Sequence, residues 1–152
     1  MSSVENNIWL NIRKLVVVVN VESPKHISEY RKALKSVGLN VHECKIIGVI
    51  KDKKVPFVAS DMGSVVLLAE NDFGLLGQLK NEDVKSLLAD SFDAILVIGD
   101  QSTRIEKVFR KIKCKINICL NSKHNFAISL VTQEVTPEYR MKFVKQIVER
   151  LK

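Results

Sequence analysis

Residues 15-LVVVVNVESPKHISEYRKALKSVG-38 decide the fold class of this chain. The first five form an apolar, mostly β-branched run that is too short for a helix and typical of a strand buried on both faces. Ser23 and Pro24 predict a helix start, because serine caps the first turn and proline fits the first helical position. Gly38 favours a helix end. Between these signals apolar residues recur at helical spacing, at Ile27, Tyr30, Leu34 and Val37. The stretch therefore predicts a strand and then a helix.

The same alternation continues along the chain. Short apolar runs predict four further strands, over residues 41–49, 64–69, 94–98 and 115–120. Capping residues predict three further helices, which begin at Asn81, at Ser102 or Thr103, and at Thr136. Strands that alternate with helices imply right-handed crossovers and a mostly parallel sheet. We therefore expect an α/β fold, a single three-layer Rossmann-like domain with helices on both faces of the sheet.

The two ends of the chain carry separate expectations. Residues 126–131 follow a polar turn over residues 121–125, which predicts an antiparallel edge strand near the C-terminus. Residues 14–152 are expected to form the single α/β domain. Residues 1–13 are expected to form an N-terminal arm that docks on this domain or on a partner. Its apolar side chains are Ile8, Trp9, Leu10 and Ile12.

Length and composition fit one packed domain. The chain has 152 residues, of which 46% are hydrophobic and 27% are charged, and this balance argues against disorder. The polar start lacks a basic leader region, and all apolar runs are shorter than the roughly 20 residues that span a membrane. We therefore expect a cytoplasmic protein with reduced thiols and with no signal peptide or transmembrane segment.

Polar residues at the predicted carboxyl ends of the strands form a candidate ligand pocket. Ligands of open α/β sheets bind beyond these ends, near a switch point of the strand order. The candidates are Asn20, Glu22, Ser23, Asp100, Ser102, Thr103 and His124. Backbone N–H groups near Ser102 are a candidate anion site. The alternative interpretation is that these residues only cap helices and form a turn.

Recognised catalytic and cofactor motifs are missing. No glycine-rich phosphate loop follows residue 19 or residue 99, which disfavours nucleotide cofactors. Residues 72–74 spell the magnesium motif of kinases, but the other kinase motifs are absent. A Cys119–His124 nucleophile and base, or a Glu22–Asp100 carboxylate pair, would have to assemble in space without a motif. We predict no catalytic residue, no metal and no cofactor, and an enzyme is the less favoured class.

Positive charge is concentrated in one segment. Residues 101–123 hold seven basic residues and a single acid, Glu106, so this segment carries +6 of the net charge of +7. Three of the basic residues recur at a spacing that puts them in one exposed stripe along the predicted helix. The candidate contact surface is Arg104, Lys107, Arg110, Lys111 and Lys115. Such a surface attracts phosphates or carboxylates, and the alternative is a helix face that is only solvated.

Three segments carry a resemblance to one family. They are 72-DFGLLGQLK-80, 92-FDAILV-97 and the stretch over residues 108–115 that leads into a strand. They resemble an uncharacterised domain-of-unknown-function family of Bacteroidota, the 6913 family, in which a similar turn precedes a helix and an F-D-x-L-I strand. The resemblance covers most of the chain after Lys14, and Leu75 or Leu76 stands where that family usually has an aromatic residue. It implies the fold and no known activity.

Three classes of function remain open. The favoured class is a non-catalytic binding module that recognises an acidic partner, either a nucleic acid or an acidic protein, through the basic surface. Because the only aromatic residue on that helix, Phe109, points inward, any contact with nucleic acid would be directed at the phosphate backbone. The second class is a small-molecule or nucleotide-binding enzyme with its site at the strand ends. The third is a structural protein that assembles through its edge strand and the turn over residues 73–76.

Overall fold

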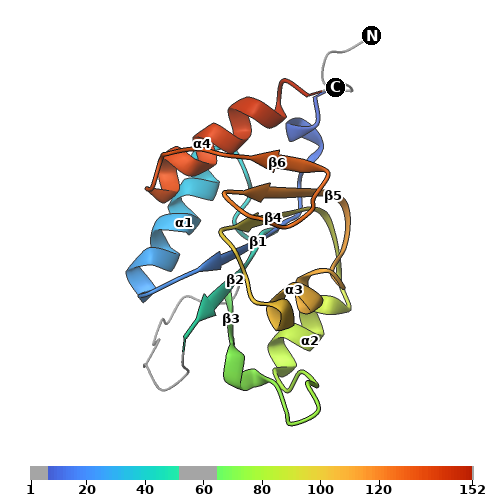
Figure 1. Cartoon of the computed structure of the whole chain (residues 1–152). Coiled ribbons are helices and arrows are strands. Elements are labelled where there is room, and N and C mark those ends of the chain that lie inside the picture. Colours follow the sequence, from blue (N-terminus) through green and yellow to red (C-terminus); the bar gives the residue numbers. More distant parts are fainter. Residues whose placement is uncertain (1–6, 52–64, 152) are drawn as a thin grey trace.

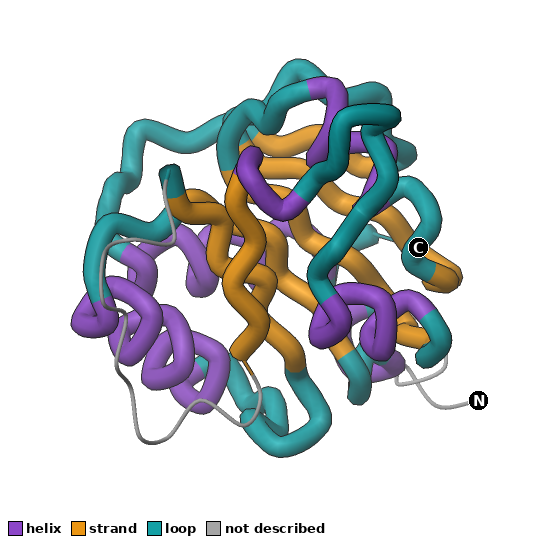
Figure 2. Tube along the Cα trace, turned by 90° about the horizontal axis from the view of Figure 1, so that it is seen from below, coloured by secondary structure: helices purple, strands orange, loops and turns teal. Residues whose placement is uncertain are grey.

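The computed structural model describes residues 7–51 and 65–151, which form one sheet with helices on both faces (Figures 1 and 2). The strands are β1 (Leu15–Asn20), β2 (Lys45–Ile50), β3 (Val65–Ala69), β4 (Ser91–Ile98), β5 (Lys113–Leu120) and β6 (Ile128–Leu130). The α-helices are α1 (Pro24–Ser36), α2 (Glu82–Leu88), α3 (Thr103–Phe109) and α4 (Pro137–Val148). The described residues also form two short 3-10 helices, η2 (Trp9–Asn11) and η3 (Glu70–Asp72). The predicted α/β Rossmann-like fold is confirmed.

The sheet has the strand order β3-β2-β1-β4-β5-β6, and every strand pair within it is parallel. The chain first builds outward from β1 to β3 and then starts again beside β1 with β4. The switch point of the sheet therefore lies between β1 and β4, where Val17 pairs with Leu96. The valine run predicts this central place, because a strand covered on both faces carries apolar side chains at every position.

Side chains of β1 alternate between two apolar layers. Val17 and Val19 face the layer that contains α1 and α4, whereas Val16 and Val18 face the layer that contains α2 and α3. The start of α1 is held as the sequence predicts, since the Ser23 hydroxyl accepts the His26 backbone N–H at 3.2 Å. Because all strand pairs are parallel, the carboxyl ends of the strands lie along the same edge of the sheet.

The predicted antiparallel edge strand is wrong. The strand β6 pairs in parallel with β5, with Ile118 opposite Ile128 and Leu120 opposite Leu130. The chain turns at Asn121, whose φ is 54°, and the intervening loop buries Phe126 against Phe109. The loop over residues 121–127 carries the chain back from the level of Leu120 to the level of Ile118. The next three residues, Ile128–Leu130, then run in the same direction as β5. A loop that buries Phe126 therefore connects β5 to β6, where the sequence predicts a tight hairpin turn.

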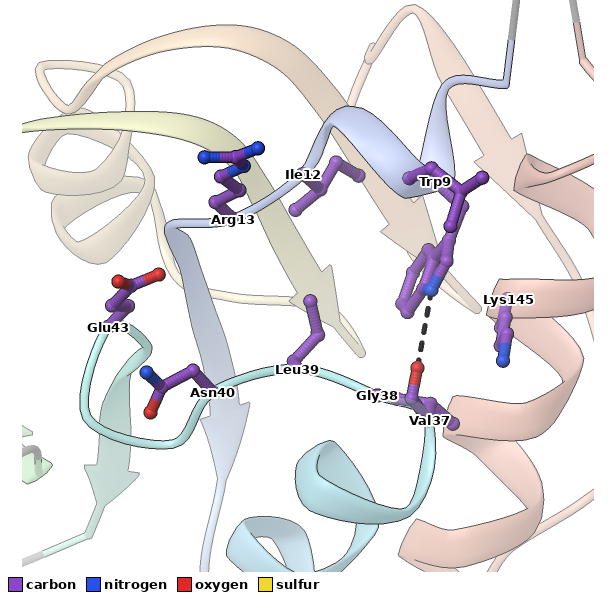
Figure 3. A pocket seen from close by; sticks show the side chains of 10 residues that line it. Trp9, Ile12, Arg13, Val37, Gly38, Leu39, Asn40, Glu43 and Lys145 are labelled. Carbon is purple, nitrogen blue, oxygen red and sulfur yellow. Dashed lines mark hydrogen bonds between the residues drawn. The ribbon is translucent and has the colours of Figure 1, made fainter. Parts of the chain in front are cut away.

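The N-terminal segment packs on the domain as far as the structure describes it. Trp9 and Ile12 are each 4% exposed and belong to the core layer of α1 and α4. The indole N–H of Trp9 donates to the Val37 carbonyl oxygen at 3.3 Å, next to a shallow hollow of about 260 Å³ (Figure 3). No helix within residues 7–51 and 65–151 is long and apolar enough to cross a membrane.

Candidate functional site

A basic groove lies between α2, α3 and the turn over residues 73–79. Its volume is about 600 Å³. Four cationic side chains line it, Lys85, Arg104, Lys107 and Lys111. Its apolar lining consists of Phe73, Leu76, Leu79, Leu88 and Val108. No carboxylate is among the described residues that line this groove, which we call the basic groove.

The helix α3 is shorter than the sequence suggests. Its first turn is capped by Ser102, whose hydroxyl accepts the Ile105 N–H at 3.3 Å, and its last residue is Phe109. Lys111 therefore lies beyond the helix, two residues before β5 begins. Lys111 still lines the same groove as Arg104 and Lys107. The expected stripe thus converges in space although only two of its members are helical.

Sequence reasoning missed the fourth cation, Lys85. It lies on α2 and forms an exposed ion pair of 3.3 Å with Glu82, three residues earlier. The sequence around Lys85 does not indicate a site. The helices α2 and α3 are separated in the chain by β4, and they become neighbours only when both pack on the same face of the sheet. The concentration of basic residues over residues 101–123 therefore predicts the α3 side of the groove and gives no indication of the α2 side, which carries Lys85.

The turn over residues 73–79 forms the apolar edge of the groove. Its ends are joined by the Gly74 N–H, which donates to the Gln78 carbonyl oxygen at 2.8 Å. Gly77 has a φ of +80°, a left-handed conformation that glycine adopts without steric cost. Leu75 and Leu76 at the tip are 103% and 94% exposed. Two neighbouring leucines with this exposure give the tip an apolar contact surface.

Asp72 supports this turn from below. One of its carboxylate oxygens accepts the Ala69 N–H at 2.8 Å and the side-chain amide of Asn81 at 3.1 Å. The carbonyl oxygen of that Asn81 amide caps α2 by accepting the Val84 N–H at 3.1 Å. In this fold the Asp72 of the kinase-like sequence at residues 72–74 is a buried carboxylate with a structural role.

Two of the five predicted contact residues lie outside the groove. Arg110 donates to the Glu106 carboxylate at 2.9 Å, and its guanidinium lies 4.9 Å from the centre of the Phe126 ring. This hydrogen bond from Arg110 lowers the pKa of Glu106. Lys115 lines a different hollow, which lies beside Asp93 where β4 and β5 begin. The expected five-residue surface is thus divided among three places.

A second cavity, the strand-end pocket, lies at the switch point between β1 and β4. It has a volume of about 460 Å³. Of the sequence-predicted pocket residues, it is lined by Asn20, Glu22, Asp100 and Ser102. Its lining also includes residues that the sequence did not single out as pocket residues, Val21, Val49, Ile50, Lys51, Glu70, Gln101 and Ile105. Loops after four different elements meet here, which explains why sequence spacing alone did not identify them.

The other predicted pocket residues serve the loops around it. Ser23 caps α1, and Thr103 is the exposed first residue of α3. His124 is buried, and its ring Nε2 accepts the Gln101 backbone N–H at 3.0 Å. The Asp100 carboxylate accepts the Lys123 N–H at 2.6 Å. These two bonds join the loop after β4 to the loop after β5.

The strand-end pocket is a poor phosphate site. Among its described lining residues, three carboxylates, those of Glu22, Glu70 and Asp100, stand against one cation, Lys51. The cap of α3 occupies the Ile105 N–H, and the helix has only seven residues. The described residues contain no group of three or more His, Cys, Asp or Glu side chains arranged to hold a metal ion.

The cysteines are placed as packing residues. Burial raises the pKa of Cys44 and of Cys114, which keeps both thiols protonated and poorly nucleophilic. The Cys119 Sγ faces the His124 carbonyl oxygen at 3.5 Å and the Ser129 hydroxyl at 3.3 Å. Because the His124 ring Nε2 is bonded to Gln101, it does not act as a base toward Cys119 in this arrangement.

Comparison with protein-family models identifies a family whose function is unknown. A family model described as "Family of unknown function (DUF6913)" matches residues 1–151. No curated protein matches the chain, and no solved structure matches it.

Proposed function

Since the chain belongs to the DUF6913 family of unknown function, its activity has to be argued from its own residues, and we propose that it is a non-catalytic binding module whose basic groove takes an acidic segment of a partner protein. Cytoplasmic location, bacterial origin in Bacteroidota and the lack of catalysis stay predictions of the sequence.

The observation that carries the proposal is the uncompensated charge of the basic groove. Four cationic side chains converge there from two helices and the segment after α3, and none of the other described lining residues carries a carboxylate. Of the four, Lys85 alone has an ion pair with a residue that the structure describes, and that pair is exposed to solvent. Converging charges of one sign raise the local concentration of an oppositely charged partner and speed its association.

The apolar lining favours a protein over a nucleic acid. Leu76, Leu79 and Leu88 offer aliphatic surface, which packs against apolar side chains and does not pair with phosphates. Single-stranded nucleic acid is usually held by exposed aromatic rings that stack on the bases. Phe73, the aromatic residue among the described groove lining, is half-buried and packs against the core layer of α2 and α3, and Phe109 of α3 is 2% exposed. An amphipathic segment with both acidic and apolar side chains matches the charge and the lining of the groove.

Defined probes test this proposal. We would measure the fluorescence anisotropy of a labelled peptide that carries glutamate and leucine at helical spacing, with a glutamine-for-glutamate peptide and labelled DNA and RNA as comparisons. We expect saturable binding of the acidic peptide that weakens as salt rises, because exposed charges are screened within about 10 Å at 0.1 M salt. The variant Arg104→Glu/Lys107→Glu/Lys111→Glu should bind the peptide more than about tenfold more weakly.

A charge-matched control separates the groove from net charge. The variant Lys113→Glu/Lys115→Glu/Lys123→Glu has the same formal charge and alters exposed residues outside the groove. It should bind the acidic peptide nearly as well as the wild type. Equal losses in both variants, or tighter binding of DNA or RNA than of the peptide, would reject the acidic-protein proposal.

A further inference from the structure

We propose that the strand-end pocket binds a small organic cation, an amine or guanidinium compound that also carries an oxygen acceptor. The pocket is separate from the basic groove, and the proposal does not depend on the function assigned to that groove. It rests on the cavity's place in the sheet, its charge, its apolar wall and one unsatisfied amide.

The position of the cavity points to a ligand. The strand order reverses between β1 and β4, and the loops that follow these two strands separate there instead of crossing over the sheet edge. Asn20 follows β1 and Asp100 follows β4, and both line the cavity of about 460 Å³. Open α/β sheets bind small molecules in this crevice beyond the carboxyl ends of the strands.

The charge of the lining selects the sign of the ligand. Glu22 and Glu70 are exposed, and within the described chain neither carboxylate takes part in a hydrogen bond or an ion pair. Asp100 adds a third carboxylate, and Lys51 is the cation among the described lining residues. This excess of negative charge stands out in a chain whose net charge is +7. It attracts a cation and repels a phosphate or a dicarboxylate.

The remaining lining defines the rest of the ligand. Val21, Ile50 and Ile105 provide an apolar wall along which a short carbon chain can lie. The side-chain Nε2 of Gln101 is shielded from solvent and has no hydrogen-bond partner within residues 7–51 and 65–151. A buried donor without an acceptor is costly, so rotation of this side chain toward an oxygen atom in the pocket would be favourable. The ligand therefore combines a cationic group, a short aliphatic part and an oxygen acceptor.

An NMR titration of nitrogen-labelled protein tests this inference. The probes are aminobutanol and agmatine, with butanol as the uncharged comparison and succinate and AMP as anionic comparisons. We expect saturable shifts with aminobutanol at the backbone amides of Asn20, Gln101 and Ser102, and weaker binding of agmatine because it lacks the oxygen acceptor. Shifts of equal size with butanol, or tighter binding of succinate or AMP at these amides, would overturn the proposal.

Two variants place the binding at the pocket. Glu22→Gln/Glu70→Gln should weaken aminobutanol binding by about tenfold, the usual effect of removing a charged hydrogen-bond partner. Glu134→Gln/Glu149→Gln removes two exposed carboxylates elsewhere and should bind as the wild type does. Unchanged binding in the first variant would also overturn the proposal. The groove variant Arg104→Glu/Lys107→Glu/Lys111→Glu should retain aminobutanol binding. Failure of the pocket proposal is therefore distinguishable from failure of the groove proposal.

Discussion

The ring Nε2 of His124 accepts the backbone N–H of Gln101 at 3.0 Å, across 23 residues of sequence. His124 is 9% exposed, and its ring lies edge-on to Phe109 with the two centroids 5.1 Å apart. The bond joins the loop after β5 to the loop that carries Gln101 and Ser102 into the strand-end pocket. A buried imidazole thereby positions one wall of that pocket without lining it.

Replacing His124 should destabilise the protein. In His124→Leu the partly buried Gln101 N–H loses its acceptor, and loss of such a hydrogen bond costs about 1 kcal/mol. Urea unfolding would measure the free energy of unfolding, with His42→Leu at an exposed histidine as the control. A loss in His124→Leu no larger than that in His42→Leu would show that the bond to Gln101 contributes little to stability.

Lys85 provides a test of the groove wall that sequence reasoning missed. Reversing its charge in Lys85→Glu should weaken binding of the acidic peptide by about fivefold, since one exposed charge contact is worth up to roughly 1 kcal/mol. Lys32→Glu, on α1 and therefore against the opposite face of the sheet, should bind the peptide as the wild type does. Peptide anisotropy compares the two variants directly. Identical affinities would remove α2 from the binding surface.

The exposed leucine tip should matter for binding and not for folding. Because Leu75 and Leu76 are 103% and 94% exposed, Leu75→Ser/Leu76→Ser should change the free energy of unfolding by less than about 0.5 kcal/mol. Peptide affinity should fall by at least about tenfold, because two leucines lose their apolar contact. Leu10→Ser is the control, at a leucine that is 52% exposed away from the groove.

The oligomeric state of the same variant examines the assembly alternative. Analytical ultracentrifugation should find wild type and Leu75→Ser/Leu76→Ser at the same mass. If the wild type self-associates and this variant does not, the tip is an interface between copies of the chain, and peptide binding through Leu75 and Leu76 is rejected.

The Glu106–Arg110 pair predicts a pH dependence of stability. The hydrogen bond from Arg110 lowers the pKa of Glu106, and partial burial of the carboxyl opposes this effect. A carboxyl with a lowered folded-state pKa stabilises the fold above its unfolded pKa, about 4.3 for glutamate, and this contribution disappears as the pH falls through the folded-state value. We expect Glu106→Gln to cost up to about 1 kcal/mol at neutral pH, because the pair is partly exposed.

The measurement is the difference in unfolding free energy between wild type and Glu106→Gln across pH. This difference should shrink below about pH 4, the range in which the carboxyl takes up a proton. Glu134→Gln is the control, because its side chain makes no hydrogen bond or ion pair in the described part of the chain. A cost in Glu106→Gln that is independent of pH would reject the electrostatic explanation.

Local sequence signals predicted the elements better than their ends. The valine run and the Ser23-Pro24 pair indicated β1 and α1, which the structure places at Leu15–Asn20 and Pro24–Ser36. The strand expected from residue 41 begins only at Lys45, because residues 41–43 form a turn. The helix expected to carry Lys111 ends at Phe109. Short-range patterns determine the type of an element, whereas packing against distant neighbours decides where it stops.

The amino-acid sequence by itself determined the fold class, the capped helix starts and the concentration of positive charge over residues 101–123. Each of these depends on residues close together in the chain. Tertiary structure alone decided the parallel direction of β6, the strand order that creates the switch point, and the meeting of Lys85 with Lys107 in one groove. It also decided that Glu22, Glu70 and Gln101 share one pocket. The reason is physical: crossovers bring together loops from distant parts of the chain, and no local spacing encodes which loops become neighbours.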